Sequence, residues 1–87
     1  LDHPARPLLV VEVAETSLAK DRGIKARLYA ECGVPEYWIV NVAKRALEVY
    51  TQPVAGKYES IRVFAPGEIA RPEAFPEVEV PVAVLFG

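Results

Sequence analysis

The feature that most constrains the fold is a nearly uninterrupted apolar run at residues 8–14 (LLVVEVA), in which both alternating faces are hydrophobic. Such a run is typical of a strand that is buried on both faces of a sheet. We therefore expect a central strand here. Its single interruption is Glu12, which shares one face of the strand with Leu8, Val10 and Ala14. A carboxylate on an otherwise apolar face needs a partner or a purpose.

A helix should follow this strand. Thr16 or Ser17 offers a hydroxyl for the N-cap. Good helix formers then continue to Cys32, and Gly33 with Pro35 ends the helix. The predicted helix has about four turns.

The remaining sequence predicts a β-meander. Residues 36–42 and 45–51 are rich in aromatic and β-branched residues and predict a hairpin. A turn at 53–56 leads to a more polar third strand at 57–64, which should lie nearer the sheet edge. Prolines then leave room for a short extended piece at 78–80 and a helical turn at 82–86. The fold class is α/β: a mixed sheet with one main helix after the first strand, joined by a right-handed crossover if the first two strands are parallel.

Length and composition exclude several classes of protein. Eighty-seven residues support one core, so we treat residues 1–87 as a single domain. A hydrophobic fraction of 52% argues against disorder, and no apolar run approaches the roughly 20 residues that span a bilayer. The single cysteine cannot form an internal disulfide, which favours the reducing cytoplasm. A net charge of −2 provides no long-range attraction for DNA, so a nucleic-acid site would have to be local.

Two charged residues lie on the apolar side of the predicted helix. At 100° per residue the apolar arc contains Leu18, Leu28, Tyr29 and Cys32, with Ile24 at its margin. Asp21 and Lys25 fall in the middle of this arc, four residues apart, so they can pair along the helix. Burying unpaired ions costs several kcal/mol by order of magnitude, so these charges should have partners.

These two residues and Glu12 should converge, because Glu12 is near the carboxyl end of its strand, where α/β sheets bind ligands. Two carboxylates and a lysine could hold a hard divalent cation and stabilise negative charge. Alternatively they form an ion network that fixes the helix against the strand. His3 is expected to be solvated, Cys32 to be a small buried hydrophobe, and Tyr37 and Trp38 to be core aromatics.

Six segments together resemble a known family. They are residues 9–14 (LVVEVA), 17–18 (SL), 21–22 (DR), Lys25, 29–30 (YA) and 33–40 (GVPEYWIV). The chain resembles the Uma-type family of restriction endonucleases, a bacterial family in the PD-(D/E)xK nuclease superfamily. The resemblance runs from about His3 to Tyr50, with the motifs in order.

The resemblance implies a restriction-endonuclease-like domain that hydrolyses DNA with Mg²⁺ or Mn²⁺. Glu12 matches the acidic member of the (D/E)xK element and would be a metal ligand. Ala14 stands where that element ordinarily has lysine, so the resemblance assigns the lysine to Lys25 and a supporting role to Asp21. The family's first catalytic aspartate, in a preceding Pro-Asp strand, has no counterpart, and Asp2 is not assigned to it. We therefore expect a carboxyl-terminal part of the domain that is inactive by itself.

A rival interpretation is an interaction or dimerisation domain that keeps the nuclease fold without the reaction. It draws on the mildly acidic charge, the missing aspartate and a sheet with too few covering elements. A homodimer is expected on either interpretation. The two differ in their response to metal, because a nuclease should be stabilised by Mg²⁺ or Mn²⁺.

Overall fold

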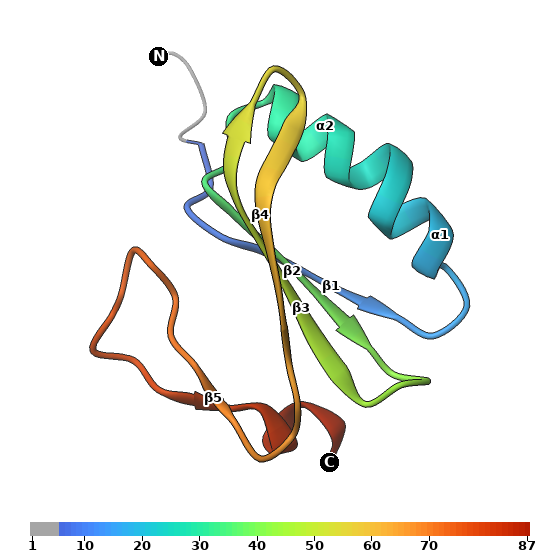
Figure 1. Ribbon diagram of the computed structural model, residues 1–87, viewed down its shortest axis with the longest axis vertical. Helices are drawn as coiled ribbons and strands as arrows, with labels where there is room; N and C mark the ends of the chain where they lie inside the picture. The colour runs from blue at the N-terminus through green and yellow to red at the C-terminus, as the bar shows by residue number, and fades with distance from the viewer. Residues whose placement is uncertain (1–5) are drawn as a thin grey trace.

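The computed structural model describes residues 6–87, which form one layered α/β unit (Figure 1). Its elements are β1 (Val10–Ala14), α1 (Leu18–Lys20), the π-helical turn η1 (Asp21–Lys25), α2 (Ala26–Glu31), β2 (Glu36–Asn41), β3 (Ala46–Val54), β4 (Lys57–Phe64), β5 (Ile69–Ala70), β6 (Val80–Pro81) and the 3₁₀ helix η2 (Val82–Phe86). The segments α1, η1 and α2 follow one another without interruption as a single helix. The predicted main helix, hairpin and third strand are confirmed.

The four long strands form one mixed sheet in the order β1-β2-β3-β4. β1 and β2 are parallel, whereas β2, β3 and β4 are successive antiparallel neighbours. The helix lies on one face of the sheet, and the carboxyl-terminal segment with η2 lies on the other (Figure 1). The predicted mixed sheet with a meander is therefore confirmed, and β4 is an edge strand as its polarity indicated.

Each face of the sheet has its own hydrophobic core. The core under the helix consists of Ala14, Ala26, Ala30, Tyr37, Ile39, Tyr50 and Tyr58. The core on the opposite face consists of Trp38, Val40, Leu47, Val49, Phe64, Ala70 and Val82. Tyr37 and Trp38 are fully buried on opposite faces of β2, so the prediction that both are core aromatics is confirmed. The central element of the sheet is therefore β2, in which every residue is buried.

The prediction of a central first strand is wrong for the described residues. β1 pairs only with β2 and is an edge strand. Val11 and Val13 point away from the helix and are 47% and 62% exposed. The apolar pattern correctly predicted two hydrophobic faces, but the carboxyl-terminal layer covers β2 and β3 and stops short of β1.

The predicted helix face is partly wrong. Ile24, Leu28 and Cys32 were expected near or within the buried arc, and all three are exposed. Ala26 and Ala30 contact the sheet instead. The π-helical turn causes this difference, because its wider winding holds one extra residue and rotates the following turns by about one residue position. Cys32 is therefore not a buried hydrophobe.

The turns and the carboxyl-terminal layer complete the fold. The turn predicted at 53–56 is shorter, because β3 continues through Val54 and only Ala55 and Gly56 form the turn, both with positive φ.

On the face opposite the helix, the buried Glu36 carboxylate accepts the Trp38 indole N–H at 2.8 Å and the backbone N–H of Glu73 at 2.8 Å. This carboxylate ties the carboxyl-terminal layer to β2.

Candidate active site

Glu12 lies in the middle of β1 on the face that the helix covers. Its cross-strand partner is Ile39, which belongs to the core under the helix. The carboxylate reaches two helix residues: Lys25 Nζ is 3.3 Å from Oε1, and the Tyr29 hydroxyl donates to Oε2 at 2.8 Å. The side chain is 25% exposed, so solvent still reaches it. Glu12 is therefore a paired but accessible carboxylate.

Asp21 is the buried member of the group. Its side chain is 1% exposed, and Lys25 Nζ lies 3.3 Å from Oδ1. The Ser17 hydroxyl donates to Oδ2 at 3.0 Å. Of the two residues predicted to cap the helix, Thr16 and Ser17, Ser17 occupies the N-cap position but makes no side-chain cap bond. Asp21 Oδ1 is buried and has no well-aligned hydrogen bond from the described residues, so the Lys25 ammonium at 3.3 Å is what compensates its charge.

The structure thus brings together the three residues that the sequence predicted. Lys25 lies between the Glu12 and Asp21 carboxylates at 3.3 Å from an oxygen of each. The π-helical turn contains both Asp21 and Lys25, and the Tyr37 hydroxyl supports it from the sheet by donating to the Asp21 backbone carbonyl at 3.0 Å. π-Helical turns occur frequently at functional sites.

The two carboxylates set the charge state of their neighbours. The Asp21 carboxylate, followed by that of Glu12, raises the pKa of the Lys25 ammonium above its ordinary value. The hydrogen bond to Glu12, followed by burial, raises the pKa of the Tyr29 hydroxyl. Lys25 is therefore a cation and Tyr29 a neutral donor at physiological pH.

Of the three site residues, Glu12 is the one that could bind a hard divalent cation. Mg²⁺ is usually held by one or two carboxylates together with water and phosphate oxygens, and Glu12 offers an accessible carboxylate of this kind. Asp21 is too buried to meet a hydrated cation. The described part of the chain contains no group of three or more potential ligand residues. Of the described residues in the site, Glu12 alone is therefore suited to bind a metal ion directly.

A second ion pair on the same helix was not predicted from the sequence. Arg22 donates from Nε and Nη2 to the two carboxylate oxygens of Glu48 on β3. Glu48 also accepts the Tyr50 hydroxyl at 2.8 Å and Asn41 Nδ2 at 3.3 Å. Burial alone would raise the pKa of Glu48, but the hydrogen bonds, led by that of Arg22, outweigh it and lower the pKa. The sequence signal for this pair was a glutamate between the apolar residues Leu47 and Val49.

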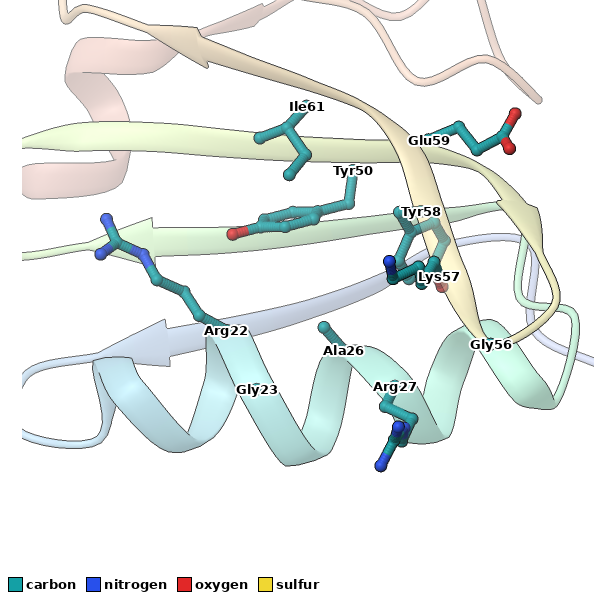
Figure 2. A pocket seen from close by; sticks show the side chains of 10 residues that line it. All are labelled: Arg22, Gly23, Ala26, Arg27, Tyr50, Gly56, Lys57, Tyr58, Glu59 and Ile61. Carbon is teal, nitrogen blue, oxygen red and sulfur yellow. The ribbon is translucent and has the colours of Figure 1, made fainter.

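A groove with a volume of about 740 Å³ runs between the helix and β4, on the Arg22 side of the helix. Its lining includes Arg22, Ala26 and Arg27 of the helix and Lys57, Tyr58 and Ile61 of β4 (Figure 2). Figure 2 shows the Arg22 side chain and the Tyr50 hydroxyl pointing toward the same end of the groove. The groove and the Glu12 site therefore lie on opposite flanks of the helix.

Comparison with known proteins identifies the family of the chain. Residues 1–83 match the Uma2 family, described as "Putative restriction endonuclease". The chain belongs to the Uma2 family. No curated protein matches the chain significantly, and no solved structure does so either. The predicted resemblance to this family is confirmed over nearly the whole chain.

Two further predictions concern the membrane and the first residues. None of the helices in the described region is long and apolar enough to cross a bilayer. Asp2 and His3 lie outside the described residues, so the prediction that His3 is solvated stays a prediction.

Proposed function

We propose that this Uma2 chain is part of a Mg²⁺-dependent DNA endonuclease that hydrolyses phosphodiester bonds, with Glu12, Lys25 and Asp21 as its site residues. Membership of a restriction endonuclease family supports DNA as the substrate. The observation that carries the proposal is the position of the Lys25 ammonium, 3.3 Å from an oxygen of Glu12 and of Asp21. A cation beside an accessible carboxylate can stabilise the negative charge that develops when a phosphodiester is cleaved.

Each of the three residues has a distinct role. Glu12 binds the metal through its carboxylate, which remains open to solvent. Lys25 stabilises the negative charge that develops on the phosphate or orients the attacking water. Asp21, buried beneath Lys25, holds the ammonium in place and does not meet the substrate. When bound, Mg²⁺ would supply Lewis-acid polarisation of a phosphate oxygen.

We expect this chain by itself to bind the metal weakly and to leave DNA uncut. The described residues offer one accessible carboxylate in the site, whereas a stable Mg²⁺ complex in nucleases draws on further oxygen ligands. If the coding sequence continues upstream, a preceding strand could pair with the free edge of β1 and bring a second carboxylate. The extended form should then bind metal where this chain does not.

The test is a Mn²⁺ titration of this chain and of an upstream-extended form, which follows the melting temperature and the nicking of supercoiled DNA together. We expect metal stabilisation and nicking from the extended form, and neither from this chain. Glu12→Gln and Lys25→Gln should abolish nicking in the extended form while the fold persists. Glu77→Gln and Lys20→Gln are matched controls, because both residues are exposed, and Lys20 lies on the same helix. Undiminished nicking by Glu12→Gln would refute the assignment.

A second candidate function is a non-catalytic interaction domain that forms a homodimer. Val11 and Val13 favour it, because they expose apolar surface on the unpaired edge strand β1. This candidate predicts a melting temperature that rises with protein concentration and does not change when Mn²⁺ is added. Val13→Lys should then abolish the concentration dependence. A metal response without any concentration dependence would exclude this candidate.

A further inference from the structure

The two carboxylates that contact the helix occupy one cross-strand row of the sheet. Glu12 on β1 pairs with Ile39 on β2, and Ile39 pairs with Glu48 on β3. Directly paired residues point to the same face, so both carboxylates face the helix with one buried isoleucine between them. The sheet therefore presents two anionic anchors to the helix, one on either side of Ile39.

The helix contacts these anchors with two cations that diverge. Arg22 reaches Glu48 on β3, and Lys25, three residues later, reaches Glu12 on β1. Both belong to the π-helical turn. The start of the helix has no side-chain cap bond, so these contacts, with the Tyr37 bond to the Asp21 carbonyl, hold its first half. The rotation of the helix about its own axis is therefore set from two sides.

The Arg22 anchor has the more extensive hydrogen bonding of the two. Its guanidinium binds both Glu48 oxygens in a bidentate pair, and Tyr50 and Asn41 saturate the same carboxylate. Glu48 is 5% exposed although Arg22 is 50% exposed, whereas Glu12 and Lys25 are 25% and 34% exposed, so the carboxylate of the Arg22 anchor is the more buried of the two. A bidentate pair fixes orientation as well as distance. Figure 2 shows the Arg22 side chain on the groove side of the helix. Lys25 instead contacts Glu12 on β1.

We propose that Arg22 and Glu48 are positioning residues for the Glu12–Lys25 site: their bidentate pair fixes the roll of the helix so that Lys25 meets Glu12. The effect of this positioning on DNA cleavage rests on the proposed nuclease function, whereas the positioning of the Glu12–Lys25 contact does not. Without the Arg22 anchor the flank of the helix that faces β3 loses its tie to the sheet, so the helix can roll and the partly exposed Lys25 side chain can leave Glu12 for solvent. Neither Arg22 nor Glu48 touches the substrate in this scheme.

The first test measures the Glu12–Lys25 contact itself and needs no metal or DNA. The coupling between Glu12→Gln and Lys25→Gln is obtained from urea unfolding in the native background and again in an Arg22→Gln background. We expect a coupling in the native chain that is lost when Arg22 is replaced. A purely structural Arg22 would lower stability and leave the coupling unchanged, which overturns the proposal. Absence of coupling in the native chain overturns it as well, because no contact is then being positioned.

Two further variants keep this test decisive. Arg27→Gln removes the same charge from the same helix at an exposed residue that forms no ion pair or hydrogen bond with Glu48, and it should leave the coupling intact. Arg22→Lys keeps the charge but not the bidentate geometry, so the coupling should be reduced without being lost. If Arg22→Gln does not fold, the comparison of Arg22→Lys with Arg27→Gln decides, and equal coupling in these two overturns the proposal.

The second test uses DNA cleavage by the form that cuts, well below its melting temperature. Arg22→Gln should lower kcat by about tenfold to a hundredfold with KM unchanged, as for a misplaced catalytic group, and Arg22→Lys should recover part of the loss. An active native protein whose Arg22→Gln variant keeps its kcat overturns the positioning role alone. A native protein that cuts no DNA in any form refutes the proposed function, and the coupling measurement then decides the positioning independently.

Discussion

Replacing Glu48 by Gln should lower the free energy of unfolding by about 2 kcal/mol, because it removes the charge that organises Arg22, Tyr50 and Asn41. Breaking a pair that is buried at both ends costs about 3–5 kcal/mol. Here Arg22 is 50% exposed and regains water, so the loss should fall well below that range. Gln keeps the size of Glu, but its amide group must face the Arg22 or Asn41 donors.

The assay is urea and thermal unfolding, followed by the fluorescence of the single tryptophan, Trp38, which is buried in the native state. A loss of about 2 kcal/mol should lower the melting temperature by roughly 8–16 °C for a domain of this size. Glu59→Gln is the matched control, because Glu59 is an exposed carboxylate on the neighbouring strand β4. A Glu48→Gln loss below about 0.5 kcal/mol, the range of ordinary surface changes, would refute the reasoning.

The same carboxylate gives this prediction a pH signature. The folded state lowers the pKa of Glu48 below its ordinary value of 4.5. The stabilisation is therefore complete above that ordinary value and is lost as the pH falls through the folded-state pKa. The difference in stability between the native chain and Glu48→Gln should be constant near neutral pH and shrink in acid. A difference that grows on acidification would contradict the assigned charge state.

Three smaller predictions address the support of the site and the corrected helix face. Tyr37→Phe should cost about 1–2 kcal/mol in urea unfolding, because the buried Asp21 carbonyl loses its donor; an unchanged midpoint would exclude this role. Gly33→Ala should cost about 1 kcal/mol, since Gly33 ends the helix at φ 74°; a stabilised variant would contradict the left-handed conformation. Cys32→Ser should change stability by less than about 0.5 kcal/mol, because Cys32 is exposed; a large loss would restore the interpretation as a core residue.

Much of the fold could be predicted because its signals are local. The apolar run around Glu12, the helix stop at Gly33 and the alternation of the meander strands each depend on a few neighbouring residues. The edge position of β1 could not be predicted, because two apolar faces indicate burial without telling which segment provides it. The exposed Leu28 was missed because a helical wheel assumes 3.6 residues per turn, and the π-helical turn breaks that period.

The candidate site, too, could be predicted only in part from the sequence. Glu12, Asp21 and Lys25 could be found because charges on apolar faces are conspicuous, and the structure brings them together. Arg22 and Glu48 were missed, because an arginine at the border of the apolar arc and a glutamate in a hairpin strand both resemble solvated residues. Their pairing depends on how far the helix lies across the sheet, which no local pattern encodes.

The single-sided pairing of β1 has a consequence for hydrogen exchange. β2, β3 and β4 are joined by short turns, whereas β1 pairs with a strand that begins more than 20 residues later in the chain. Among the described strands, β2 is the only neighbour of β1. The amides of β1 should therefore exchange through local opening while those of β2 and β3 exchange only when the whole chain unfolds. Glu12 lies on this edge strand, so we expect the site to open while β2 and β3 stay folded. Any chain that pairs with the outer edge of β1 would suppress this local unfolding and stabilise the site.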